Sequence, residues 1–242
     1  MAQILQLDGV SKSFGAVTVA DGLSYGLAKG EALGVLGPNG AGKTSMFNLI
    51  TGTLMADSGR ISFEGEDITR MSAARRSRAG IARSFQVPQP FTHMTVFENA
   101  MVAATQSAGL SGREAERLCI DVLDQTELLG KANDRAGGLT LLNRKRLELT
   151  RALCAKPRLL LLDEIAGGLT EAECTSLIAT IKSIHASGVS IIWIEHVVHA
   201  LMAVVERLIV IDFGRKIAEG EPRAIMESPE VQEIYLGIEA DA

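Results

Sequence analysis

Eight consecutive residues carry the first chemical signal in this sequence: Gly37, Pro38, Asn39, Gly40, Ala41, Gly42, Lys43 and Thr44. They fit the pattern G-x-x-x-x-G-K-[ST] at every fixed position. The three glycines allow the backbone to curl until successive N–H groups point inward at an anion. The Lys43 side chain can reach the β- and γ-phosphates of a nucleotide, and the Thr44 hydroxyl can ligate Mg²⁺. We therefore expect this run, with the following Ser45, to bind nucleotide phosphates.

A second candidate site follows an apolar run in the C-terminal half of the chain. Residues 159–162 are all leucine, and the run ends in Asp163 and Glu164. A parallel strand that helices cover on both faces has this composition. At its carboxyl end, Asp163 would hold Mg²⁺ through water, and Glu164 is a candidate to polarise an attacking water. An apolar run ending in an acid is weak evidence alone, but after a phosphate loop it indicates nucleotide hydrolysis.

Two predicted elements position the phosphate-binding run. Residues 32–36 have the length and apolar character of a short buried strand, and residues 44–51 predict a helix that ends at Gly52. The N-terminus of that helix adds partial positive charge beneath bound phosphates. A chance glycine-rich turn is the alternative interpretation, and the strand before the loop and the helix after it argue against that alternative.

The rest of the sequence before the apolar run at residues 159–162 predicts two subdomains. Residues up to about Gly30 alternate short apolar and polar groups, and residues 60–68 look similar, so we expect antiparallel strands in both segments. Residues 113–130 and 144–155 predict helices. We expect these helices to belong to a helical subdomain, at about residues 87–157, that is inserted into an α/β core.

The segment after Glu164 predicts alternating helices and strands. These are helix 171–187, strand 189–194, a helix through Val205, and a hairpin of strands 208–212 and 216–218. A strand, a helix and a strand after a phosphate loop indicate a mostly parallel sheet. The expected fold class is therefore α/β, with an N-terminal antiparallel β subdomain and an inserted helical subdomain.

Composition excludes several classes of protein. The 242 residues carry a net charge of −5, so we expect no nucleic-acid partner. No stretch approaches the run of about 18 uncharged apolar residues that a membrane-spanning helix needs. The three cysteines form no C-x-x-C pair, and we expect free buried thiols in a reducing compartment: Cys119, Cys154 and Cys174.

Two groups of basic residues and three histidines receive no functional role. The basic groups predict solvated faces: Arg75, Arg76 and Arg78, and Arg144, Lys145 and Arg146. The histidines have spacings that suggest no metal site: His93, His185 and His199.

Four further features resemble the ATPase subunits of ABC transporters. In that family an aromatic ring at the place of Phe14 stacks on adenine, and the glutamine at the place of Gln86 senses Mg²⁺ and the γ-phosphate. Residues 166–170 lie where the dimer-contacting loop follows the acidic strand, and His196 matches the histidine that contacts the γ-phosphate. The resemblance covers nearly the whole chain. It implies a P-loop NTPase fold and ATP with Mg²⁺ as ligands.

The resemblance also assigns roles to individual residues. It implies catalytic roles for Glu164, His196, Gln86 and Lys43. It implies that Thr44, Gln86 and Asp163 hold Mg²⁺. Phe14, the run from Gly37 to Ser45 and Asp163 would together bind the nucleotide.

One segment departs from the family pattern. The family signature is Leu-Ser-Gly-Gly-Gln at the N-terminus of a helix, where it contacts the γ-phosphate bound by the opposite subunit of a dimer. Here the matching residues are Leu139, Thr140, Leu141, Leu142 and Asn143. Backbone N–H groups survive, but two leucine side chains in place of glycines could block a close approach. The dimer-contacting loop also ends in Thr170, where an acid or amide is usual.

Three stretches are similar to branched-chain amino acid importer ATPases in particular: residues 85–91, residues 94–99 and residues 231–237. Lipopolysaccharide-export and urea-uptake ATPases share parts of them. The resemblance implies an ATPase domain over residues 1–237 and a C-terminal tail of residues 238–242.

The resemblance further implies partners and a location. Two ATPase subunits would enclose two ATP molecules; the altered signature favours a heterodimer with a second ATPase subunit, and a homodimer stays open. Separate transmembrane permease subunits would hold the chain at the cytoplasmic face of the inner or plasma membrane. The alternatives are a lipopolysaccharide-export ATPase, a nucleotide-gated regulatory module with little hydrolysis, and a soluble ABC protein of DNA repair or translation. The single short cassette argues against the last.

Overall fold

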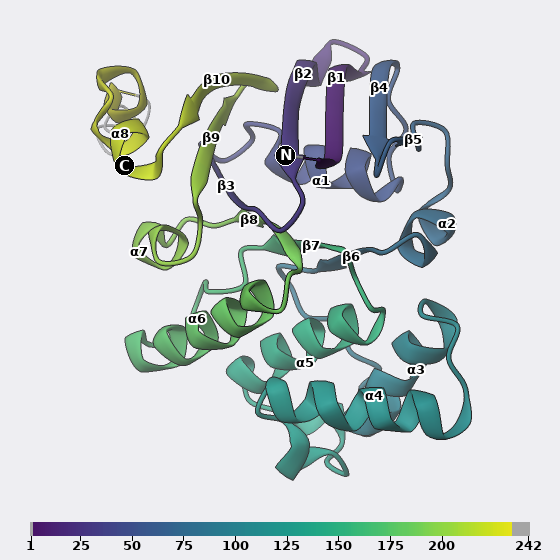
Figure 1. Ribbon diagram of the computed structural model, residues 1–242. Helices are drawn as coiled ribbons and strands as arrows, with labels where there is room; N and C mark the ends of the chain where they lie inside the picture. The colour runs from purple at the N-terminus through teal and green to yellow at the C-terminus, as the bar shows by residue number, and fades with distance from the viewer. Residues whose placement is uncertain (1, 234–242) are drawn as a thin grey trace.

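The computed structural model describes residues 2–233, which form two sheets and a group of helices (Figure 1). The N-terminal strands β1 (Gln3–Phe14) and β2 (Val17–Ala28) pair antiparallel, and β1 also pairs antiparallel with β4 (Ser58–Phe63). The short β5 (Glu66–Asp67) completes this sheet in the order β2-β1-β4-β5. The expected antiparallel β subdomain is confirmed.

The second sheet has six strands in the order β10-β9-β3-β8-β7-β6. Its members are β3 (Ala32–Leu36), β6 (Ile81–Ser84), β7 (Leu159–Asp163), β8 (Ser190–Ile194), β9 (Arg207–Asp212) and β10 (Arg215–Gly220). All neighbours run parallel except β9 and β10, which form an antiparallel hairpin. The mostly parallel sheet and the C-terminal hairpin are therefore as predicted.

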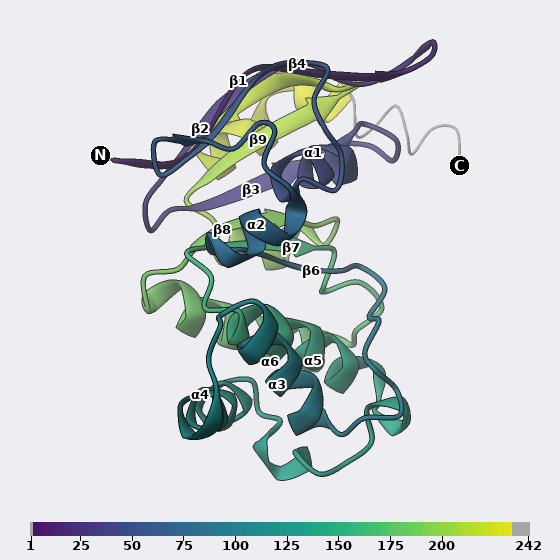
Figure 2. The same cartoon turned by 90° about the vertical axis from the view of Figure 1, so that its right-hand side faces the viewer.

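The helices fall into two groups. The helices beside the sheets are α1 (Lys43–Thr51), α2 (Ala73–Arg78), α6 (Glu171–Ala186), α7 (Val198–Met202) and α8 (Pro222–Glu227). The helical subdomain contains α3 (Val96–Gln106), α4 (Gly112–Gln125) and α5 (Leu141–Cys154), with 3₁₀ turns at Leu129–Lys131 and Ala136–Gly138. Figure 2 shows α3, α4 and α5 on the opposite side of the mostly parallel sheet from the antiparallel sheet.

Both faces of the mostly parallel sheet are buried. Alternate residues of a strand point to opposite faces, so Leu160 and Leu162 of β7 belong to the apolar cluster on the side of α5 and α6. Leu161 of the same strand belongs to the cluster on the side of α1 and the antiparallel sheet. Two covered faces explain why β7 is an unbroken run of leucine.

Three helices differ in length from the expectation. Helix α4 ends at Gln125 rather than near Gly130, because Glu127 adopts a left-handed backbone with φ 58° that a helix cannot contain. Helix α5 begins at Leu141 rather than Arg144, because the Thr140 side chain caps it by accepting the N–H of Asn143. Helix α7 is shorter than expected, and β6, α2 and α3 have no counterpart in the sequence-based prediction.

The expectation of two solvated basic faces is only half right. Arg75, Arg78 and Arg144 are exposed, whereas Arg76, Lys145 and Arg146 are buried. The guanidinium of Arg76 donates to the carbonyls of Leu49 and Ile50 at the end of α1. These carbonyls have no partner within the helix, and a cation at a helix C-terminus is favourable, which explains the buried arginine. Burial lowers the pKa of Arg76 to about 10.

The three cysteines are free and buried, as expected. None of the helices in residues 2–233 combines the length and the apolar character needed to cross a membrane. The tail at residues 238–242 and the last part of the 231–237 stretch lie outside the described residues, so the domain limits stay a prediction.

Candidate functional site

The phosphate loop connects β3 to α1 and passes between β2 and β9. At Gly37 (φ 152°) an added Cβ would lie 2.0 Å from the carbonyl oxygen of Ile211 in β9. At Gly42 (φ 99°), which caps α1, a Cβ would lie 2.3 Å from the carbonyl oxygen of Val19 in β2. Both positions therefore require glycine. The loop is held at the N-terminus of a helix, where an anion is favoured.

A pocket of about 400 Å³ opens over this loop. It is lined by Val19, Asn39, Gly40, Ala41, Gly42, Lys43, Thr44, Ser45, Gln86 and Glu164. The structure thus brings Gln86 and Glu164, which are remote from the loop in sequence, to the loop itself. The helix start, the lysine and a carboxylate share one cavity.

Lys43 is folded back over the loop rather than extended into solvent. It is 6% exposed, and its Nζ donates to the carbonyls of Gly37 at 2.6 Å and Pro38 at 2.8 Å. Burial lowers the pKa of Lys43, and the negative charges of Glu164 and Asp163 partly oppose that effect. The ammonium therefore lies where it can meet an anion held by the loop.

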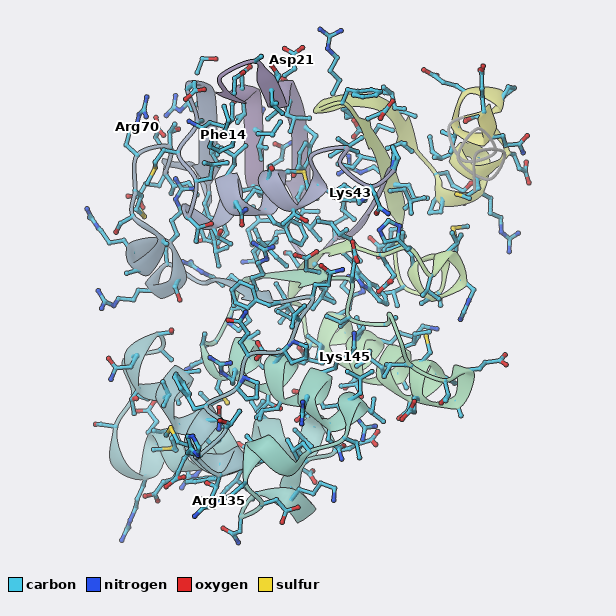
Figure 3. The ribbon with its side chains drawn as sticks, turned by 180° about the vertical axis from the view of Figure 1, so that it is seen from behind. Phe14, Asp21, Lys43, Arg70, Arg135 and Lys145 are labelled. Carbon is cyan, nitrogen blue, oxygen red and sulfur yellow. The ribbon has the colours of Figure 1, made fainter. Side chains whose placement is uncertain are left out.

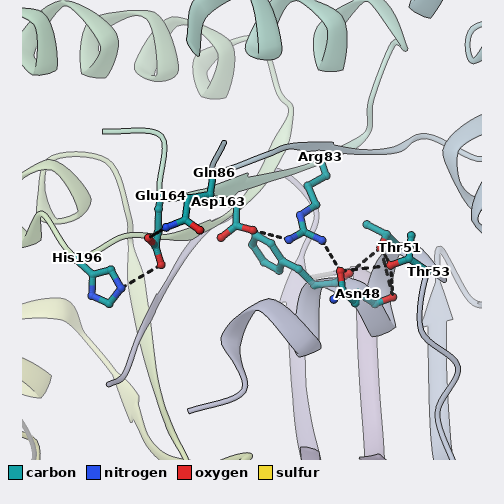
Figure 4. Close-up of polar contacts among 9 residues, drawn as sticks. Asn48, Thr51, Thr53, Arg83, Gln86, Asp163, Glu164 and His196 are labelled. Carbon is teal, nitrogen blue, oxygen red and sulfur yellow. Dashed lines mark hydrogen bonds and ion pairs between the residues drawn. The ribbon is translucent and has the colours of Figure 1, made fainter. Parts of the chain in front are cut away.

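Glu164 lies at the centre of a three-residue contact, which Figure 4 shows. Its Oε2 accepts a hydrogen bond from Gln86 Nε2, and its Oε1 lies 3.0 Å from His196 Nε2. The Glu164 backbone has φ 45°, a left-handed conformation that costs about 1–3 kcal/mol outside glycine. The three side chains implied by the family resemblance are therefore together, and their roles in catalysis stay a prediction.

Asp163 is buried beside this contact and pairs with a residue that sequence reasoning missed. Its Oδ2 accepts from Arg83 Nη2, and Arg83 Nη1 donates to Asn48 Oδ1 at 2.7 Å (Figure 4). Burial raises the pKa of Asp163, and the charge of Arg83 opposes the rise. The other oxygen, Asp163 Oδ1, is buried with no hydrogen-bond partner among the described residues.

The donor set fits Mg²⁺. An orphaned carboxylate oxygen of Asp163 and the Thr44 hydroxyl, which lines the pocket, are the oxygen donors that this cation prefers. Gln86 lines the same pocket and could contribute its amide oxygen.

Comparison with known proteins decides the family. A family model described as ABC transporter matches residues 20–167. The chain is 34% identical to the high-affinity branched-chain amino acid transport ATP-binding protein BraF of Pseudomonas aeruginosa, over 97% of this chain and 98% of that protein. The chain belongs to the ABC transporter family. The family resemblance inferred from the sequence is confirmed, and as an ABC ATPase the chain binds and hydrolyses ATP.

Other matches agree with this ABC ATPase assignment. A model of the branched-chain amino acid ATP-binding cassette transporter matches residues 215–241. The lipopolysaccharide export system ATP-binding protein LptB of Acidithiobacillus ferridurans is 30% identical over 98% of each chain. A crystal structure of the ADP conformation of an ATP-binding cassette of an ABC transporter superposes with a TM-score of 0.90 at 31% identity, covering 98% of this chain and 100% of that chain.

Phe14 of this ABC ATPase lies apart from the pocket lining. It ends β1 in the antiparallel sheet, is 55% exposed, and lies 5.3 Å, ring centroid to nitrogen, from Lys12 Nζ (Figure 3). From the same hairpin it is Val19 that lines the pocket. The ring is exposed, as a base-stacking side chain must be, and its contact with adenine stays a prediction.

The altered signature forms the start of α5, and it lies beside the dimer-contacting loop of the same chain, since Leu141 and Gly167 line one pocket. Leu141 is 46% exposed, and its Cδ2 would lie 3.4 Å from a Cβ added at Gly168. Thr170 ends that loop by capping α6, where its side chain accepts the N–H of Glu173. The Thr170 substitution thus preserves a helix cap, whereas Leu141 presents a bulky apolar side chain where the family has a glycine.

Proposed function

We propose that this ATPase energises an ABC importer of branched-chain or related amino acids. The support comes from the relative with the branched-chain amino acid name and from the match of the C-terminal residues to the branched-chain cassette model. The lipopolysaccharide-export relative is the less similar of the two relatives, at 30% against 34% identity, and gives the export alternative less support.

The observation that carries the ATPase chemistry is the shared pocket of Lys43, Gln86 and Glu164. Mg²⁺, when bound, supplies charge neutralisation at the phosphates. The Thr44 hydroxyl and the free oxygen of Asp163 would hold it. Lys43 would bind the β- and γ-phosphates from beneath.

Glu164 would act on the attacking water. Its carboxylate accepts a hydrogen bond from that water and polarises it, and it can hold the water's proton as bond formation proceeds. The contacts with Gln86 Nε2 and His196 Nε2 orient the two carboxylate oxygens, which reduces the freedom that must be lost in the transition state. The protein thus contributes position and charge rather than a covalent intermediate.

The test of the site is Lys43→Ala. We expect ATP affinity to fall by about tenfold or more, since a charge-assisted contact to phosphate is lost, and steady-state hydrolysis to disappear. Equilibrium binding of ATP and phosphate release measure the two effects. Lys182→Ala, which changes an exposed lysine on α6, is the matched control. Unchanged ATP affinity and turnover in Lys43→Ala would refute the site.

We infer a head-to-tail dimer with a second, different ATPase subunit. This chain carries Lys43 and Glu164 in its own nucleotide half-site. The signature that it would offer to its partner's nucleotide is bulky, because it contains Leu141 and Leu142. A homodimer would pair every ATP with that signature. A partner with glycines at these positions would complete the site built on this chain.

We further propose that permease subunits dock this chain at the cytoplasmic face of the membrane. A cavity of about 280 Å³ lies between α3, α5 and β6, and Phe85 lines it. Three large apolar side chains are exposed on the segment that follows: Phe85 at 49%, Val87 at 66% and Phe91 at 45%. Gln86 lies between Phe85 and Val87 in the sequence. A permease segment bound to these apolar side chains would therefore contact the backbone segment that carries Gln86.

The leucines of the signature favour one second candidate, a nucleotide-gated regulatory module that hydrolyses little ATP. Steady-state turnover of the chain together with its co-purified membrane partners separates the candidates. Turnover that increases with transported substrate supports the importer ATPase, and ATP binding without turnover supports the module.

A further inference from the structure

Glu195 is a buried carboxylate that none of the roles above uses. It is 1% exposed and directly precedes His196. Its Oε2 accepts the backbone N–H of Ala166 at 2.9 Å. Its Oε1 accepts the backbone N–H of His196 at 3.0 Å and of Val197 at 3.3 Å. One side chain therefore satisfies amides from two loops that are far apart in the sequence.

These two loops carry the side chains that meet in the site. Ala166 lies two residues after Glu164, whose own N–H donates to the carbonyl of Ile194 at 2.8 Å. Thus Ile194 holds the amide of Glu164, and Glu195 holds the amide of Ala166. Glu164 has a left-handed backbone that relaxes unless its surroundings fix it, and these bonds fix it from the β8 side.

Lys145 completes the arrangement from the helical subdomain. It is 5% exposed on α5, and its Nζ donates to the carbonyl of Glu164 at 3.3 Å. Burial lowers the pKa of Lys145, and the charges of Glu195 and Glu164 oppose that effect. Figure 3 shows Lys145 on the side of α5 that faces the sheets. The bond from Lys145 therefore holds the Glu164 backbone from the α5 side.

We propose that Glu195 is a positioning residue that sets the placement of Glu164 relative to His196 by accepting amides from both loops, while Lys145 on α5 holds the carbonyl of Glu164. A carboxylate is required because both of its oxygens face N–H donors. In Glu195→Gln the amide group would place its own N–H₂ against one of the two sets of donors, and that loop would lose its partner. The proposal rests on the proposed roles of Glu164 and His196 only for its effect on turnover.

The first test measures the loops directly and does not depend on activity. Hydrogen exchange of the full chain, followed by mass spectrometry over peptides that contain Ala166 and peptides that contain His196 and Val197, reports the protection of these amides. In Glu195→Gln we expect exchange at one or both sites to accelerate by about tenfold, because a bond to a charged acceptor is lost. Glu31→Gln is the matched control. Glu31 also accepts a backbone amide, that of Ala28, but it lies just before β3, at the end of that strand away from the phosphate loop.

The second test asks whether Glu195 acts through the catalytic pair. We expect Glu195→Gln to lower kcat by about tenfold and to leave the ATP dissociation constant within about twofold, because the phosphate loop is untouched. In a His196→Ala background the same substitution should have little further effect on kcat, whereas a general loss of stability would add to the His196→Ala defect.

The outcomes separate the proposal from the function it rests on. If Glu164→Gln retains full turnover, the proposed catalytic role fails, and the exchange experiment still decides the role of Glu195. If Glu164→Gln is inactive but Glu195→Gln leaves exchange unchanged at both sites, or its kcat effect adds fully to that of His196→Ala, the positioning role is wrong. Should Glu195→Gln not fold, Glu195→Asp takes its place: the shorter side chain should keep the His196 amide protected and lose the Ala166 amide, and protection of both would overturn the proposal.

Discussion

The buried ion pair of Asp163 and Arg83 shows how single side chains in the site depend on one another. Asp163 is 2% exposed, and the Arg83 guanidinium lies 5.4 Å from the ring centroid of Phe47 and 5.1 Å from that of Phe85. Little water can reach either charge. Arg83 pairs with Asp163 Oδ2, whereas Asp163 Oδ1 has no hydrogen-bond partner among the described residues and is available to a cation.

Replacing Arg83 by glutamine should leave Asp163 buried without its counter-charge. We expect Arg83→Gln to lower the free energy of unfolding by about 3–5 kcal/mol, measured by urea denaturation at neutral pH. Burial, which already raises the pKa of Asp163, would then be opposed only by the charge of Lys43. The loss should therefore shrink as the pH falls and the carboxyl is protonated in both the folded and the unfolded state.

A second substitution checks the cause. In Arg83→Gln combined with Asp163→Asn the buried charge is gone, so part of the stability should return. A loss below about 1 kcal/mol in Arg83→Gln, or no recovery in the double variant, would show that the pair is not what stabilises this part of the sheet.

The residues of the site could be predicted where their chemistry is local in sequence. The phosphate loop is one continuous run, and Asp163 and Glu164 follow an unmistakable apolar strand. Arg83 is 80 residues from Asp163, and Glu195 is 29 residues from Ala166. Only the order of strands in the sheet brings these pairs together, so no local pattern marks them.

The limits of helices and strands could likewise be predicted where the signal is local in the sequence. The limits of β3 and β7 agree with the sequence to within one residue, because every residue in them is buried and all but Gly34 and Asp163 are apolar. Helix ends were harder to predict, since side-chain caps such as Thr140 and left-handed residues such as Glu127 set them. Strand β6 escaped prediction because its charged Arg83 is paired inside the protein rather than exposed.

The apolar surface around β6 and α3 gives a prediction at the scale of elements. Val87→Glu introduces a charge at a side chain that is 66% exposed, so the fold should tolerate it. If permease subunits dock there, the variant should be lost from membranes while its ATP affinity stays unchanged, because burying an unpaired carboxylate in an apolar interface is costly.

Membrane fractionation of tagged chains, with ATP binding measured on the same preparations, checks this outcome. Ile120→Glu is the matched control, since Ile120 is 46% exposed on α4. Equal membrane association of Val87→Glu and the wild type would place the docking surface elsewhere.

The asymmetry between a well-built nucleotide half-site and an altered signature is a property of the whole molecule. In the assembled transporter we expect a heterodimer in which hydrolysis occurs mainly at the site built on Lys43 of this chain. Glu164→Gln here should stop transport, whereas the matching change in the partner ATPase should have a milder effect. Measuring transport with each site inactivated in turn tests this. Equal losses from the two changes, or full activity of this chain as a homodimer, would contradict the asymmetric arrangement.

In the proposed mechanism, Glu164 polarises the water that hydrolyses ATP held by the phosphate loop. The most direct measurement compares ATP binding and phosphate release in the wild type and in Glu164→Gln, in which an amide of the same size replaces the carboxylate. The variant should bind ATP with nearly unchanged affinity and lose hydrolysis by about 100-fold or more. Wild-type phosphate release from Glu164→Gln would contradict it.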